Sequence, residues 1–107
     1  MSEGLYFITI TGVDRIGIVA RVSSAIFRHG GNIVDSYQRI MGKYFIIALL
    51  VDMRQPDASI QRLLKDFSEI EQDWGLRILV QHENGFIHTS REAVDSDKPV
   101  AIPEDNL

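Results

Sequence analysis

The fold is decided by a short stretch near the start of the chain, Thr11-Gly12-Val13-Asp14-Arg15-Ile16-Gly17-Ile18-Val19. Before this stretch, apolar residues alternate in the manner of a β-strand, and after it they recur at helical spacing. The stretch is therefore a glycine-containing turn from a strand into a helix. Such a turn points backbone N–H groups outward at the positive end of the helix, which suits a small anion such as a carboxylate.

The apolar pattern predicts six elements before residue 84. They are, in order, a strand at 5–12, a helix at 18–29, extended segments at 33–41 and 44–51, a helix at 60–74 and a strand at 76–80. Asp14 is the N-cap candidate for the first helix, and Asp57 or Ser59 for the second. This β-α-β-β-α-β order over residues 5–83 predicts the α+β class, as a ferredoxin-like plait with a four-stranded antiparallel sheet and two helices on one face.

Composition limits the classes of function. The 107 residues are the size of one domain, and the net charge of −4 argues against a nucleic-acid surface. Because the chain has no cysteine, disulfides, thiol catalysis and cysteine-ligated metal sites are excluded. No segment approaches the roughly 20 apolar residues that span a bilayer, and no secretory signal is visible. We expect a cytoplasmic protein that binds neither membrane nor nucleic acid.

Two parts are expected within the chain. Residues 1–84 form the folded domain, and residues 85–107 form a C-terminal extension or arm, in which 85–88 could add a short extended piece. The charged, proline-containing end of this extension is too polar to build a core of its own.

The segment from Tyr44 to Val51 is apolar without a break, which predicts a strand buried on both faces. Helices cover only one face of a plait, so the other face would expose more apolar surface than a monomer usually shows. A homodimer that covers this face is the favoured explanation. The alternative is that the C-terminal arm folds back over it.

Three segments together resemble the ACT domain, a family of small regulatory modules that bind amino acids and control metabolic enzymes or transcription. They are Gly12 to Val19, His29-Gly30-Gly31-Asn32-Ile33-Val34-Asp35, and Gly42-Lys43-Tyr44-Phe45. The resemblance covers residues 5–83. It is closest to stand-alone members, to glycine-cleavage repressor-like proteins, and to the amino-terminal domains of formyltetrahydrofolate deformylase and phosphoserine phosphatase. Ile16 departs from the family, which often has proline at this position.

The resemblance implies a ligand site formed by the first loop, with Asn32 across from it. The loop positions are Gly12, Asp14, Arg15, Ile16, Gly17 and Ile18. Free N–H groups of Ile16, Gly17 and Ile18 can hold an α-carboxylate. The Asp14 carboxylate can pair with an α-ammonium, and the Asn32 amide can donate and accept.

Each of these residues also has a simpler explanation, which the sequence leaves open. Asp14 can act as a helix cap alone, and Asn32 as a turn residue. Gly17 can serve the packing of helix on strand, and Arg15 can be a solvated charge.

The resemblance implies a regulatory domain rather than an enzyme. Such a domain senses a free amino acid and modulates a metabolic enzyme or regulator, with no cofactor and no metal. One alternative is a ligand-free dimerisation or protein-interaction module. The other is an acylphosphatase-like hydrolase, a plait enzyme with an arginine in its first strand–helix loop and a nearby asparagine, for which Arg15 and Asn32 are the candidates. Phosphate-loop, serine-nucleophile and histidine metal-site patterns are not met.

Overall fold

The computed structural model describes residues 4–85 and 87–89. Its strands are β1 (Leu5–Val13), β2 (Asn32–Met41), β3 (Tyr44–Asp52), β4 (Arg77–His82) and β5 (Ile87–Thr89). Its helices are α1 (Ile18–Arg28) and α2 (Ile60–Trp74). The first six elements follow the predicted β-α-β-β-α-β order, which confirms the ferredoxin-like plait.

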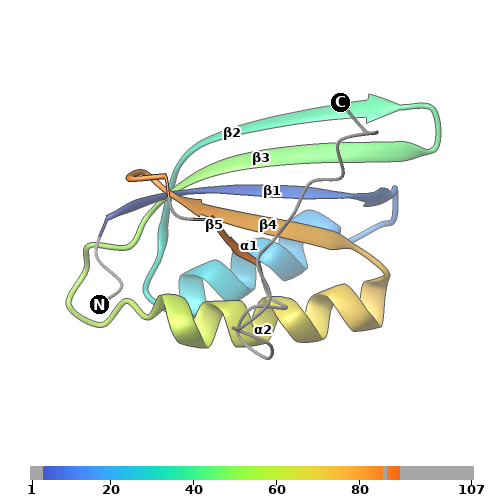
Figure 1. Cartoon of the computed structure of the whole chain (residues 1–107). Helices are drawn as coiled ribbons and strands as arrows, with labels where there is room; N and C mark the ends of the chain where they lie inside the picture. The colour runs from blue at the N-terminus through green and yellow to red at the C-terminus, as the bar shows by residue number, and fades with distance from the viewer. Residues whose placement is uncertain (1–3, 86, 90–107) are drawn as a thin grey trace.

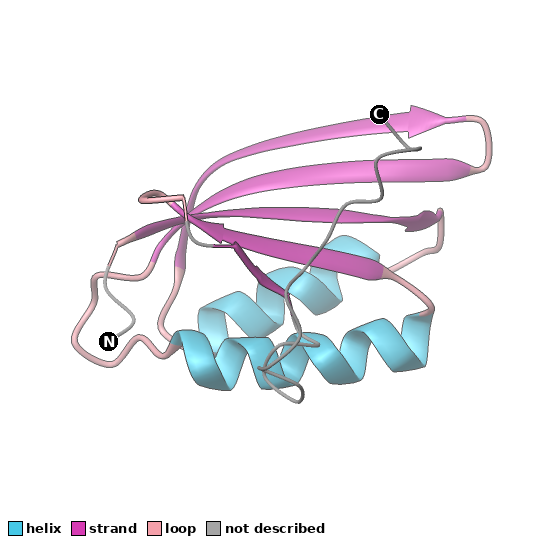
Figure 2. Ribbon diagram, viewed as in Figure 1, coloured by secondary structure: helices cyan, strands magenta, loops and turns pink. Residues whose placement is uncertain are grey.

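The strands form one antiparallel sheet in the order β2-β3-β1-β4-β5 (Figure 1). Four of these strands are the predicted sheet. The fifth, β5, is a three-residue strand that pairs with β4 at the sheet edge, within the segment where the sequence allowed a short extended piece. Both helices lie on the same face of the sheet (Figure 2).

The core lies between this sheet and the two helices. Side chains of β1 alternate between the two faces of the sheet, and Tyr6, Ile8 and Ile10 are the set that is buried against the helices. The helices contribute apolar residues at three- and four-residue spacing, and Leu63 and Phe67 of α2 are completely buried. Neither helix in the described part of the chain is long and apolar enough to cross a membrane.

A buried charge joins the two helices. Asp66 of α2 is 8% exposed. Its carboxylate oxygens lie 3.5 Å from Arg21 Nη2 and 3.3 Å from Arg28 Nη1, both on α1. The Nε2 atom of His29, the C-cap residue of α1, lies 3.2 Å away. These partners offset the cost of burying a carboxylate and hold α1 against α2.

The two helices begin differently. α2 has a conventional N-cap, because the Ser59 hydroxyl accepts a hydrogen bond from the Arg62 N–H at 3.2 Å. Of the two candidates for this cap, Ser59 is therefore the one used. In contrast, α1 has Gly17 as its N-cap and no side-chain cap.

The opposite side of the sheet, here called the outer sheet face, carries residues of β1–β4 that point away from the helices. Phe7, Tyr37, Met41 and Tyr44 on this face are each more than half exposed. Ile46, Ala48 and Leu50 of β3 are partly exposed. The prediction that β3 is buried on both faces is therefore wrong for a single chain, because the helices cover only the side of Phe45, Ile47, Leu49 and Val51.

Candidate ligand site

The turn between β1 and α1 is held by the neighbouring hairpin. The Asp14 N–H donates to the Lys43 carbonyl at 2.9 Å, which ties the loop to the turn between β2 and β3. The helix begins later, with Gly17 as N-cap at φ 90° and ψ 0°. The prediction that Asp14 caps α1 is therefore wrong. Asp14 lies three residues before the actual cap, and its backbone is engaged by the hairpin.

The first turn of α1 presents unbonded amides. The first N–H with a helical acceptor is that of Arg21, which donates to the Gly17 carbonyl at 2.9 Å. The N–H groups of Ile18, Val19 and Ala20 precede it and have no acceptor within the helix. This first turn holds no acidic residue, so its positive end is not neutralised from within. The sequence predicted that the N–H groups of Ile16, Gly17 and Ile18 are free. Of these three, only that of Ile18 belongs to the unbonded first turn.

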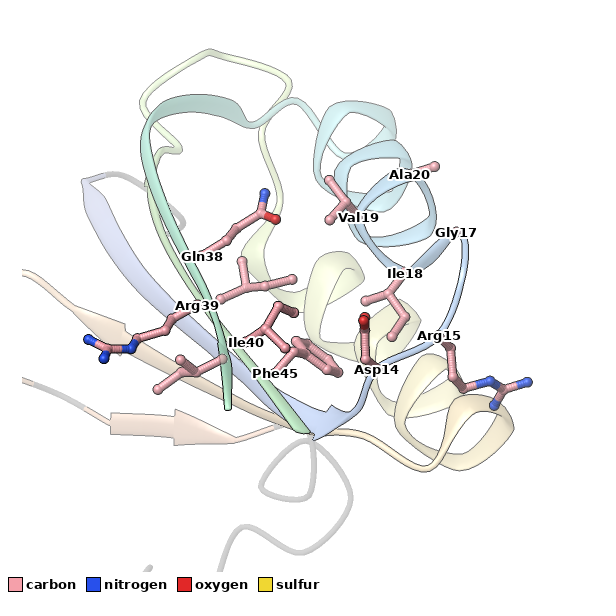
Figure 3. Close-up of a pocket in the computed structure, with 12 residues that line it drawn as sticks. Asp14, Arg15, Gly17, Ile18, Val19, Ala20, Gln38, Arg39, Ile40 and Phe45 are labelled. Atoms are coloured by element: carbon pink, nitrogen blue, oxygen red, sulfur yellow. The ribbon is translucent and has the colours of Figure 1, made fainter. Parts of the chain in front are cut away.

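These amides border a cleft of about 130 Å³ between the start of α1 and the helix-facing side of β2 and β3. Figure 3 shows the side chains that converge on it, namely Asp14, Ile18, Val19, Gln38, Ile40 and Phe45. The apolar members of this set form the floor, and the Asp14 carboxylate and the Gln38 carboxamide supply polar groups. Neither of these two side chains has a hydrogen-bond or ion-pair partner among residues 4–85 and 87–89.

Arg15 borders the cleft, but its guanidinium points away from it (Figure 3). Its Nη1 donates to the Trp74 carbonyl at 3.2 Å, and its central carbon lies 5.0 Å from the centre of the Trp74 ring. Trp74 ends α2, so the cation lies at the negative end of that helix. Arg15 thus connects the loop to α2. The neighbouring Ile16 is 100% exposed.

Gly12 does not line the cleft. It lies in β1, where a Cβ atom would come within 2.7 Å of Leu76 Cδ2. The glycine thus leaves room for the Leu76 side chain to pack against the strand, which is a structural role.

Asn32 lies at the opposite end of α1. It pairs with Asp52 at the start of β2 and borders a separate hollow of about 440 Å³ beside the end of the helix. The 11 residues of α1 separate its two ends by about 16 Å. The prediction that Asn32 lies across from the loop is therefore wrong within one chain.

Sequence reasoning missed two cleft residues of β2, Gln38 and Ile40. Their cross-strand partners, Ile47 and Phe45, face the helices, so Gln38 and Ile40 face the same way. A signal for this was present, because the helix-facing set of β2 is mixed and includes Ser36, whereas that of β3 is entirely apolar. A mixed set indicates that the helices do not fully cover β2.

The arrangement is suited to binding a small molecule with both a negative and a positive group. Amide donors and a positive helix end lie on one side, and a carboxylate and a carboxamide lie nearby. No group of three or more His, Cys, Asp or Glu side chains in the described ranges could hold a metal ion.

Comparison with known proteins finds similarity over most of the chain. A family model described as the ACT domain matches residues 5–81. A UPF0237 protein of Methanopyrus kandleri is 35% identical over 77 residues, which cover 72% of this chain and 86% of that protein.

Two solved structures share the fold at similar sequence identity. An ACT domain protein from Streptococcus pneumoniae superimposes with a TM-score of 0.64 at 26% identity, over 91% of this chain and 99% of that chain. A chain assigned as a glycine cleavage system transcriptional repressor gives a TM-score of 0.66 at 27% identity, over 79% of this chain and 48% of that chain.

Proposed function

The chain belongs to the ACT domain family, and we propose that it binds a small free amino acid in the cleft beside α1 and thereby regulates a metabolic enzyme or another regulator. The family and its structural neighbours support a small-molecule-binding regulatory domain.

The cleft carries the proposal, because its groups complement a zwitterion. The amides of Ile18, Val19 and Ala20 can donate to an α-carboxylate at the positive end of α1. The Asp14 carboxylate, which has no partner among the described residues, can pair with an α-ammonium. Gln38 can donate to one group and accept from the other.

The size of the cleft supports a small ligand. Its volume of about 130 Å³ corresponds to about four water molecules, since each occupies about 30 Å³ in the liquid. The floor contains Ile40 and Phe45, which offer no charged partner to a ligand side chain. Small, apolar amino acids therefore fit the cleft best.

The regulated partner, a homodimeric state and a cytoplasmic location belong to the same proposal. The net charge of −4 supports partners other than nucleic acid. A bound ligand would act only through its different affinities for two states of the domain or of its complex.

Isothermal titration calorimetry with a panel of free amino acids tests the proposed site. The wild type should bind a small amino acid. Asp14→Asn keeps the side-chain size but removes the negative charge, so we expect the affinity to fall about tenfold or more. Asp57→Asn is the matched control, since Asp57 is exposed and lies near Gly30 beyond the other end of α1.

Two results would contradict this assignment. If the wild type binds no amino acid, the ligand-free interaction module becomes the better explanation. If binding survives both Asp14→Asn and Gln38→Ala, the ligand site lies elsewhere. The acylphosphatase-like alternative is not favoured, because Arg15 is directed toward α2 and Asn32 lies at the far end of α1.

A further inference from the structure

The homodimer, which is part of the proposed function, needs an interface, and the outer sheet face has the pattern of one. Residues directly opposite on neighbouring antiparallel strands share a face, so this surface is arranged in rows that cross the strands. Its three middle rows, taken from β2 through β3 and β1 to β4, are Arg39-Ile46-Thr11-Arg77, Tyr37-Ala48-Thr9-Leu79 and Asp35-Leu50-Phe7-Gln81.

The two rows that flank the middle row are complementary to each other. On β2, Arg39 in one row corresponds to Asp35 in the other, and both side chains are exposed. On β3, Ile46 in one row corresponds to Leu50 in the other, and both side chains are apolar. The neighbouring acid Asp52 is paired with Arg54 at 2.9 Å. The Asp35 carboxylate accepts a hydrogen bond from the N–H of the adjacent Ser36 at 2.8 Å but has no ion-pair partner among the described residues, so it can still pair with a cation of a second copy.

We propose that two copies of this chain pack their outer sheet faces together about a two-fold axis that follows the row Tyr37-Ala48-Thr9-Leu79. This rotation turns each strand end for end. The row on one side of the axis in one subunit therefore faces the row on the other side of the axis in the partner subunit. Arg39 then faces Asp35 of the partner subunit, and Ile46 faces Leu50 of the partner subunit. A two-fold interface requires this reciprocal matching of one patch with itself.

The packing at the axis supports this arrangement. Ala48 and Thr9 are the small residues of the middle row, which lets the two sheets approach there. Around them lie Phe7 and Tyr37, both more than half exposed in the single chain. Sheets packed face to face cross at about 30°, and the long arginine side chain spans the offset that this crossing introduces.

The size of the face is sufficient for an interface. The 9 residues of β1 at about 3.3 Å each, and four strands about 4.8 Å apart, give roughly 500 Å² of flat area. Side-chain relief increases this area toward the roughly 600–1,000 Å² that each partner of a standard interface contributes. The face mixes exposed apolar side chains such as Phe7 and Tyr37 with charged ones such as Arg39 and Asp35, which is the composition of an interface with a polar rim.

Sedimentation velocity on the full chain tests the arrangement by charge reversal. The wild type should form dimers. Arg39→Asp and Asp35→Arg each place like charges together twice per dimer, so each variant should weaken dimerisation about tenfold. An equimolar mixture of the two variants should regain near-wild-type association, because every contact in the heterodimer again joins opposite charges.

A second pair of variants tests the position of the axis. Ala48→Lys brings two lysines together at the centre of the proposed interface and should abolish dimers. Gln61→Lys adds the same charge at an exposed position of α2, away from the sheet, and should leave dimerisation unchanged. Circular dichroism of each variant checks that the fold is retained.

Three outcomes would overturn the inference: a monomeric wild type, dimers that are insensitive to Ala48→Lys, and a mixture of the reversal variants that fails to associate. A monomeric wild type would favour the alternative that the C-terminal arm covers this face, and dimers insensitive to Ala48→Lys would place the interface elsewhere on the domain. A monomeric wild type would also remove the homodimer from the proposed function. Amino-acid binding is measured separately, by calorimetry on the wild type, so loss of the ligand site is distinguishable from loss of this interface.

Discussion

Gly17 sets the geometry of the cleft at the scale of a single residue. Most N-cap residues are extended, but Gly17 has φ 90°, which side chains other than glycine rarely adopt. Contact with neighbours does not explain the glycine, because an added Cβ would meet only Trp74 Cη2, at an ordinary 3.5 Å. The backbone conformation alone therefore accounts for glycine here, and it starts α1 beside the cleft, which Gly17 and the next three residues border.

Replacing Gly17 should strain the backbone without a steric clash. We expect Gly17→Ala to lower the free energy of unfolding by about 1–2 kcal/mol. Gly17→Asn should cost less, because asparagine tolerates left-handed conformations better than alanine. Urea denaturation of both variants measures the difference, and equal losses would show that the positive φ is not the cause.

Asp52 gives a pH-dependent prediction. The Arg54 side chain donates to its carboxylate, the Arg54 N–H adds a second hydrogen bond, and together they lower the pKa of Asp52 below its usual value of 3.8. A lowered folded-state pKa stabilises the fold above the usual value, and this contribution is lost as the pH falls through the folded-state pKa.

Asp52→Asn should therefore reduce the free energy of unfolding more at about pH 7 than at about pH 2, because protonation of Asp52 in acid removes the contribution of its lowered pKa. Denaturation at the two pH values measures this change. Asp57→Asn, at an exposed site, provides the comparison and should behave alike at both. A loss for Asp52→Asn that is equally large in acid would show that the carboxylate charge is not responsible.

At the scale of elements, the position of α1 is set by contacts at both of its ends. At its N-terminus, the loop is tied to the hairpin through Asp14 and to α2 through Arg15. Toward its C-terminus, the Asp66 cluster joins it to α2. The helix is thereby held away from β2, and the cleft occupies the space left beside that strand.

Removing the charge at Asp66 should loosen the two helices. We expect Asp66→Asn to lower the free energy of unfolding by about 1–3 kcal/mol, because Arg21, Arg28 and His29 lose the buried charged acceptor that they share. Glu69→Gln removes an exposed charge from the same helix and should change stability by less than about 0.5 kcal/mol. Similar values for the two variants in urea denaturation would argue against a joining role for Asp66.

At the scale of the whole molecule, β2 connects the two proposed surfaces. Because side chains alternate along a strand, Gln38 and Ile40 border the cleft while Tyr37 and Arg39 lie on the outer sheet face. A ligand that bridges α1 and β2 would order the strand that also carries Arg39 and Asp35, the two residues of the proposed ion pairs. Binding and dimerisation are therefore expected to depend on each other.

The coupling can be measured in both directions. A saturating amino acid ligand should tighten the dimer about fivefold, the lower end of common coupling factors, and dimerisation should tighten ligand binding by the same factor. Sedimentation with and without ligand gives the first number, and calorimetry over a range of protein concentrations gives the second. If the ligand leaves the dissociation constant of the dimer unchanged, the cleft and the outer sheet face are not coupled.

The sequence alone determined the six elements of the plait and their order. Alternation in residues 5–12 and helical spacing from Ile18 are local patterns, and burial of apolar surface converts them directly into a plait. The sequence also led to the prediction that the first loop is a ligand site. It showed that both alternating residue sets of β3 are apolar.

Only the tertiary structure decided which residues meet. Asp14 is bonded to Lys43, Arg15 stacks on Trp74, Asn32 lies a helix length from the loop, and Gln38 enters the cleft. These contacts join segments far apart in the chain, so they depend on how α1 is placed against β2 and α2. Local periodicity carries no information about that placement, because it is fixed by hydrogen bonds and packing formed only when the whole sheet is assembled.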